Sequence, residues 1–151
     1  MGGGAIPVTS ELKGDLLVMG CNDNKIYMLN VEMLMHDPAA SMYAEFECPL
    51  YHKVEHIAIN SNCSTIAISG AESRIAIREL NLRKPFNIAE MMKPSMSVRK
   101  NYNFKCHRED SKDLRKSYIR PLNGMKFHPR RNDILATCGG DGIVFVWDID
   151  N

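Results

Sequence analysis

The sequence predicts an all-β fold made of four-stranded antiparallel units, the blades of a β-propeller. Three similar segments begin at residues 20, 70 and 139, and each has a turn of small residues with one acid before a short apolar strand. Another short aliphatic run precedes each turn, at residues 16–19, 65–69 and 134–138. Such runs with turn residues on both sides are typical of buried strands rather than helices.

Further strands complete the units. An upstream strand is expected at 54–59 and 122–127, and a fourth strand at 42–47 and 102–106. Lys25, Arg74 and Ile143 occupy the same place after the turns of the three units. A ring of seven blades at ~40 to 45 residues each needs roughly 300 residues. The chain therefore supplies about two to three blades, and we expect other segments or another copy to cover its open faces.

The propeller is expected over residues 15–151, after a Gly-rich leader at residues 1–14. Two stretches interrupt the repeat and are predicted to be loop insertions, at 81–100 and 109–120. Residues 88–92 of the first insertion can form a helical turn, which Pro94 would end. Its methionines either form an adaptable contact surface or, more commonly, pack the loop down: Met91, Met92 and Met96.

Composition indicates an ordinary globular chain. The 151 residues are 44% hydrophobic and 25% charged, with a net charge of +1, so overall charge does not indicate a nucleic-acid partner. The apolar runs are far shorter than the ~20 residues that span a bilayer, and no signal peptide is visible. Five cysteines without a C-x-x-C pair indicate reduced intracellular thiols rather than disulfides.

The third unit resembles the end of a WD repeat. Its Gly139-Gly140-Asp141-Gly142 turn leads into a strand that closes on Trp147-Asp148, and His107 lies 40 residues before Trp147. This resemblance implies a WD40-type propeller. It also implies a buried hydrogen-bonded set, because a buried Trp N–H and a buried carboxylate need partners. The set would be His107, Thr137, Asp141 and Trp147.

A longer stretch is similar to one WD-repeat subfamily, which contains the nuclear-pore mRNA export factor and the Bub-class mitotic checkpoint protein. The similarity covers residues 15–150, and the block from Asn103 to Arg108 and the strand from Glu72 to Ile77 carry it. The resemblance implies a non-enzymatic scaffold in mRNA export that docks a GLEBS-type segment of a nucleoporin. The alternative is a spindle checkpoint protein that binds kinetochore kinases through the same type of motif. Either would be found in the nucleus, the nuclear envelope and pore, and the cytoplasm.

The same resemblance implies a partner-binding site at Arg74 and Arg108, with Glu72 and Lys105 beside them. In the subfamily these two positions hold a short acidic and apolar helical segment. A guanidinium suits this task because it grips a carboxylate with two parallel hydrogen bonds. Arg74 is expected to begin the third strand of its blade and Arg108 to end the fourth, so they lie close together. We expect no single local acid to serve both, with Glu72 and Glu109 each quenching one.

A second cluster of basic residues is a candidate RNA contact, since such clusters hold phosphates. Its members are Lys112, Arg115, Lys116, Arg120, Arg130 and Arg131. Glu109, Asp110 and Asp113 dilute the charge, so a solvated loop of mixed charge is the alternative.

The sequence predicts no catalytic, metal or cofactor site. Cys106 and His107 are adjacent, so in a strand their side chains point to opposite faces and cannot pair as nucleophile and base. A zinc site built from Cys106, His107, His128 and Cys138 lacks the usual spacing. The Gly139–Gly142 turn lacks the Lys-Ser/Thr pair and the helix of a phosphate-binding loop.

Overall fold

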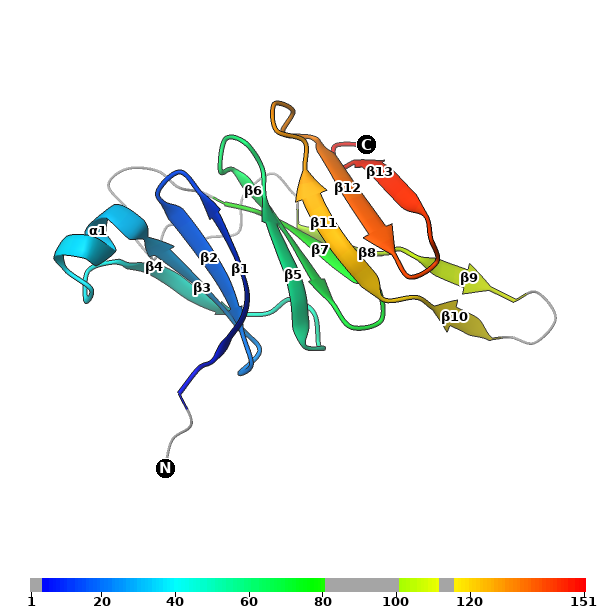
Figure 1. The fold of residues 1–151 in the computed structure, drawn as a ribbon, viewed down its shortest axis with the longest axis horizontal. Coiled ribbons are helices and arrows are strands. Elements are labelled where there is room, and N and C mark those ends of the chain that lie inside the picture. The colour runs from blue at the N-terminus through cyan, green and yellow to red at the C-terminus, as the bar shows by residue number, and fades with distance from the viewer. Residues whose placement is uncertain (1–3, 81–100, 112–115) are drawn as a thin grey trace.

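The structure is a computed structural model that describes residues 4–80, 101–111 and 116–151. Three antiparallel sheets of four, four and three strands follow one another along the chain, and a two-stranded ribbon extends from the connection between the second and third sheets. The sheets lie face to face, with the middle sheet between the other two (Figure 1). The predicted all-β fold is therefore confirmed.

The strands occupy nearly the predicted positions. The first sheet contains β1 (Pro7–Lys13), β2 (Leu16–Cys21), β3 (Lys25–Asn30) and β4 (Met42–Glu47). The middle sheet contains β5 (Val54–Ile59), β6 (Thr65–Gly70), β7 (Arg74–Glu79) and β8 (Tyr102–Lys105). The third sheet contains β11 (Leu122–Phe127), β12 (Ile134–Gly139) and β13 (Val144–Asp148).

One part of the predicted leader belongs to the fold. Residues 7–13 form β1, which pairs with β2 through a tight turn at Gly14, where φ is +55°. The boundary predicted at residue 15 therefore cuts through a hairpin. Gly14 was predicted to end the leader, but it has a left-handed conformation and forms the turn of this hairpin.

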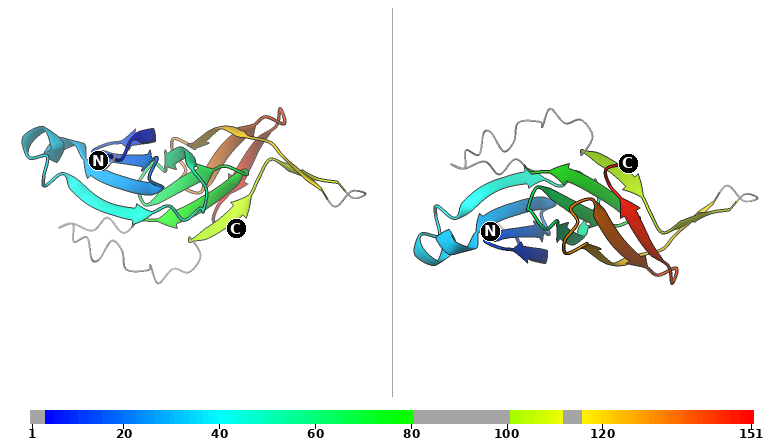
Figure 2. Two further views of the ribbon diagram at one scale, coloured as in Figure 1. Left: turned by 90° about the horizontal axis from the view of Figure 1, so that it is seen from below. Right: turned by 90° about the horizontal axis from the view of Figure 1, so that it is seen from above.

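The second predicted insertion contains regular structure. Residues expected in a loop at 109–120 form an antiparallel ribbon of β9 (Arg108–Asp110) and β10 (Ser117–Ile119), which projects beyond the stacked sheets (Figure 2). The insertion at 81–100, with its helical turn and methionines, lies outside the described residues. A short helix that the sequence did not predict, α1 (Val31–His36), joins β3 to β4.

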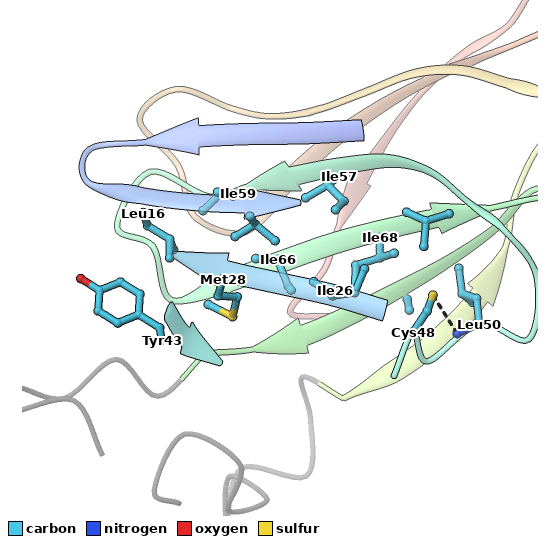
Figure 3. Packing of buried hydrophobic residues seen from close by; sticks show 13 residues of the cluster. Leu16, Ile26, Met28, Tyr43, Cys48, Leu50, Ile57, Ile59, Ile66 and Ile68 are labelled. Atoms are coloured by element: carbon cyan, nitrogen blue, oxygen red, sulfur yellow. Dashed lines mark hydrogen bonds between the residues drawn. The ribbon is translucent and has the colours of Figure 1, made fainter. Parts of the chain in front are cut away.

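Two apolar layers hold the sheets together. Side chains alternate along β6, so Ile66 and Ile68 contact the first sheet while Ala67 contacts the third. The first layer packs these isoleucines against Ile26 and Met28 (Figure 3). Val18 belongs to the same layer. The second packs Ile75 and Ile77 against the third sheet, at Leu122, Met125, Phe127 and Leu135.

The middle sheet is consequently buried on both faces, and all six residues of β6 are buried. The outer faces of the two flanking sheets keep exposed apolar side chains, among them Val8, Leu12, Val144 and Val146. In the part of the chain that is described, no helix reaches the length and hydropathy needed to cross a membrane.

Truncating the first apolar layer should destabilise the fold. Ile68 is 0% exposed, so Ile68→Ala removes packed methyl groups and leaves a cavity, which costs about 2 to 5 kcal/mol. Urea denaturation of the full-length protein measures this as a lowered midpoint. The control is Met35→Ala on α1, where the side chain is 79% exposed and almost no change is expected. Equal midpoints for the two variants would contradict the stacked arrangement.

Candidate partner-binding site

The four residues of the WD-type set lie together and share hydrogen bonds. The Trp147 indole Nε1 donates to Thr137 Oγ1 at 2.9 Å, and Thr137 Oγ1 lies 3.0 Å from His107 Nε2. On its other side, His107 Nδ1 lies 2.9 Å from both carboxylate oxygens of Asp141. A neutral imidazole with its proton on Nδ1 satisfies each step, because Thr137 then donates to Nε2 and His107 donates to the carboxylate.

Backbone geometry places the His107 ring. His107 has a φ of +46°, which turns the chain between β8 and β9 and directs the ring over Gly139. A Cβ atom at Gly139 would lie 2.4 Å from His107 Nδ1, so only glycine leaves room for the imidazole. The edge of the ring packs on Phe145, with ring centroids 5.0 Å apart. This left-handed residue also ends β8 at Lys105, so Arg108 begins β9 rather than ending the fourth strand.

Trp147 is half-buried, whereas the WD-type spacing implies a buried ring. It packs on Phe104 and Phe145, at centroid distances of 5.0 and 5.3 Å. The remaining exposure follows from its place on β13, which is the edge strand of the third sheet in this chain.

The carboxyl of Asp141 is held in its ionised form. Burial alone would raise its pKa, but the Ile143 amide and the His107 ring donate hydrogen bonds to it, and the net effect lowers the pKa below its usual 3.8. The Ile143 amide lies 3.0 Å from Asp141 Oδ1. Asp141 thereby closes its own turn and anchors the imidazole.

Arg74 and Arg108 lie around one carboxylate, that of Glu72. The Arg74 Nε atom is 3.6 Å from Glu72 Oε2, and Arg108 Nη2 is 3.8 Å from the same oxygen. Arg108 also donates to the Glu72 carbonyl oxygen, from Nε at 3.2 Å and from Nη2 at 2.7 Å. The expectation that no single acid serves both arginines is therefore wrong.

The conformation of the β6–β7 turn explains why the sequence did not show this. Glu72 and Ser73 both have left-handed backbones, with φ of +70° and +51°, which is uncommon for residues other than glycine, asparagine and aspartate. Ser73 is 1% exposed, and its hydroxyl donates to the Arg120 carbonyl oxygen. The turn is thus tied to the end of the β9–β10 ribbon by a side chain that glycine would not supply.

One contact of Glu72 was not predicted from the sequence as part of the binding site. His52, in the loop between β4 and β5, has its Nε2 atom 3.3 Å from Glu72 Oε1. Tyr51, next to it, is 99% exposed. A side-chain contact between residues 20 positions apart cannot be inferred from a strand pattern, although an exposed aromatic beside a histidine is a signal of a contact surface.

Lys105 lies directly opposite Arg74 in the β7–β8 register and is exposed. Arg74 and Arg108 therefore lie around the Glu72 carboxylate, and Lys105 lies beside Arg74 on the neighbouring strand. This end of the middle sheet carries an excess of positive charge, which favours an anionic partner.

The four described candidates for RNA contact lie in two separate pairs. Lys116 and Arg120 flank β10, whereas Arg130 and Arg131 lie in the turn after β11. The two pairs stand at opposite ends of β11 (Figure 1), a strand of six residues that spans roughly 20 Å. Arg131 is also paired with Asp133 at 2.5 Å. Lys112 and Arg115 lie outside the described residues.

The cysteine and histidine at 106 and 107 have separate roles. Burial raises the pKa of the Cys106 thiol to about 11, against a smaller opposing effect of Arg108, and the thiol donates to the Ser73 carbonyl oxygen at 3.4 Å. The sulfur is therefore protonated and packed rather than nucleophilic. Within the described ranges, no three His, Cys, Asp or Glu side chains gather as metal ligands would.

Two groups of proteins are similar to most of this chain. It is 30% identical to the spindle assembly checkpoint protein bub3 of Schizosaccharomyces pombe over 141 residues, which cover 93% of this chain and 38% of that protein. It is 28% identical to the mRNA export factor GLE2 of Chaetomium thermophilum over 142 residues, covering 94% and 34%. The mRNA export factor of Sus scrofa is 30% identical over 115 residues, covering 73% and 28%. No protein-family model matches the chain.

This chain is a homologue of WD-repeat β-propeller proteins. The resemblance inferred from the sequence is confirmed. The homologues support a WD-repeat scaffold, either of the mRNA export kind or of the spindle checkpoint kind. The chain spans 38% or less of the length of these three relatives. The activity and partners of the whole protein are therefore proposed below.

A solved structure agrees with this family of folds. The chain superposes on "KlHsv2 with loop 6CD replaced by a Gly-Ser linker" with a TM-score of 0.61 at 13% identity, covering 95% of this chain and 38% of that one. At this identity the likeness shows the fold alone. It confirms that the stacked sheets are arranged like the consecutive blades of a β-propeller.

Removing the hydroxyl at the centre of the WD-type set should destabilise the third blade. Thr137→Val leaves the Trp147 and His107 nitrogens without their shared partner, at an expected cost of about 2 kcal/mol. Chemical denaturation measures the loss. Thr137→Ser keeps the hydroxyl and is the control, so a Ser variant as unstable as the Val variant would contradict the hydrogen-bonded role.

The Asp141 carboxyl should make folding sensitive to acid. Because its pKa is lower in the folded state than in the unfolded chain, its contribution is present above about pH 4 and is lost as the pH falls through the lowered value. Asp141→Asn should therefore flatten the fall of the denaturation midpoint between about pH 5 and pH 3. Parallel pH profiles for the two proteins would argue against an anchoring carboxylate.

Proposed function

We propose that this protein is a non-enzymatic scaffold that docks a short acidic segment of a protein partner on the face around Arg74 and Arg108. The partner is a GLEBS-type segment of a nucleoporin, and the process is mRNA export. The observation that carries the proposal is the Glu72 carboxylate placed between the two guanidinium groups. A site that already accommodates one carboxylate has the geometry to accept another.

The distances support a site with spare capacity. At 3.6 and 3.8 Å the Glu72 carboxylate is too far from either arginine for a hydrogen bond. Arg108 has a side chain that is only 14% exposed and is fixed on the Glu72 carbonyl oxygen, whereas the Arg74 side chain is 41% exposed. Arg108 is thus a rigid support, and Arg74 is the group that an incoming carboxylate reaches first.

A second candidate is the spindle checkpoint, favoured by the 30% identity to bub3 over 141 residues. The partner would then be a kinetochore kinase that carries the same type of motif. Homologues of both kinds support a nuclear role, and we extend this to the nuclear envelope and pore and the cytoplasm. Affinity capture with the full-length protein tests the two roles, since nucleoporins support export and checkpoint kinases support the alternative.

Replacing either arginine should weaken binding of a GLEBS-like peptide. Arg74→Ala and Arg108→Ala are each expected to cost about 2 kcal/mol, or roughly 30-fold in affinity, in isothermal titration with the full-length protein. Arg74→Lys should recover only part of the loss, because an ammonium cannot form two parallel hydrogen bonds. Arg130→Ala, an exposed arginine in the turn after β11, is the matched control and should bind normally.

A double variant tests whether one carboxylate is shared. If the partner's carboxylate bridges both arginines, the losses of the two single variants should not add in the double variant. Unchanged affinity in both single variants would overturn the site. Denaturation midpoints measured beside the titrations separate lost binding from lost folding, chiefly for the half-buried Arg108.

A further inference from the structure

A cavity of about 520 Å³ opens next to Arg108, between the base of the β9–β10 ribbon and the β12–β13 turn. Its size lies within the ~300 to 1,000 Å³ of typical ligand pockets. Arg108 belongs both to this cavity and to the cluster around Glu72, so the two features are continuous on one face. The lining residues are Arg108, Glu109, Arg120, Gly140, Asp141, Ile143 and Phe145.

The cavity combines an apolar wall with basic groups. Ile143 is 47% exposed, and Phe145 is half-buried against the His107 ring. The Asp141 carboxylate accepts hydrogen bonds from His107 and from the Ile143 amide, which occupies much of its capacity. The groups that face a ligand are therefore two guanidiniums, the Glu109 carboxylate and an apolar wall.

Neighbouring blades present different side chains at one equivalent place. Arg74 is the first residue after the β6–β7 turn, and Ile143 holds the same place after the β12–β13 turn. The equivalent residue of the first sheet, Lys25, is paired with Glu45 at 3.1 Å. A bound peptide that runs from the middle sheet to the third sheet therefore contacts the cationic Arg74 first and the apolar Ile143 second.

We infer that the acidic segment proposed above continues past Arg108 into this cavity. It places an apolar side chain against Ile143 and Phe145, and an acidic residue beside that side chain faces Arg120 at the rim. The inference rests on the proposed function and deepens it, because it adds an order of residues, acidic then apolar, to the partner. It assigns Arg120 to a protein partner, whereas the sequence made it a candidate RNA contact.

Charge complementarity selects this occupant. Four basic side chains lie along the path, those of Arg74, Lys105, Arg108 and Arg120, against the three carboxylates of Glu72, Glu109 and Asp141. This excess favours an acidic segment over a basic or neutral one. The apolar wall lies beyond the arginines and not among them. An anion such as free phosphate would gain nothing from Ile143, so dependence on this side chain separates a peptide from a small anion.

The test is isothermal titration of the full-length protein with the acidic–apolar peptide and with versions in which each apolar residue is replaced by alanine. Ile143→Ala should weaken binding of the unmodified peptide about fivefold, the effect of losing modest apolar burial. The same substitution should leave one alanine-replaced peptide unaffected, which identifies the residue that enters the cavity. Arg120→Ala should weaken binding about threefold at low salt and less at high salt.

Two control variants match these changes. Lys116→Ala removes an exposed cation from the same ribbon, and Met35→Ala removes an exposed apolar side chain from α1; both should bind as the unmodified protein does. Normal affinity in both Ile143→Ala and Arg120→Ala, with affinity still dependent on Arg74, would overturn this inference and leave the proposed function standing. Absence of any binding by the unmodified protein would overturn both.

Discussion

The middle sheet is stable only between two other sheets, because both of its faces carry apolar side chains that must be buried away from water. Ile66 and Ile68 emerge on one face, and Ile75 and Ile77 on the other. Burial of both faces is the dominant favourable contribution to such a structure, so the flanking sheets must stack on it. Stacking antiparallel sheets with strands of nearly equal length brings their turns to a common end. The β6–β7 and β12–β13 turns meet there, on either side of the chain segment that links β8 to β9.

The stacked strands were predictable because they depend on local pattern. The repeated pattern of short strands between turn residues predicts ten of the eleven strands in the three sheets. The strand that was missed, β1, follows no such pattern, since Val8 and Leu12 are separated by polar residues and face outward. The WD-type set was available through resemblance, because its residues keep a characteristic spacing. The contacts of Glu72 could not be predicted from the sequence, because they depend on the backbone conformation of the β6–β7 turn and on His52 from another loop.

Three left-handed residues other than glycine gather at this common end: Glu72, Ser73 and His107. Each such conformation costs roughly 1 to 2 kcal/mol and persists only when surrounding contacts compensate. Here the compensation is visible. The Ser73 hydroxyl bonds to the Arg120 carbonyl, the His107 ring bonds to Thr137 and Asp141, and Arg108 holds the Glu72 carbonyl. Of the five left-handed residues other than glycine in the described part of the chain, these three lie beside the proposed site, and backbone strain that side chains compensate is common at functional sites.

The structural set and the binding face are joined through backbone bonds. The Arg120 amide donates to the His107 carbonyl oxygen at 3.0 Å, while the Arg120 carbonyl accepts from Ser73. The backbone of one residue, Arg120, therefore links the imidazole anchor, the ribbon and the turn that carries Glu72. Arg108 follows His107 directly, so the WD-type hydrogen bonds that fix the imidazole also fix where this guanidinium is presented. The WD-type set of the third blade thus positions Arg108 beside Glu72 of the middle blade, and the binding face proposed above lies at the junction of these two blades.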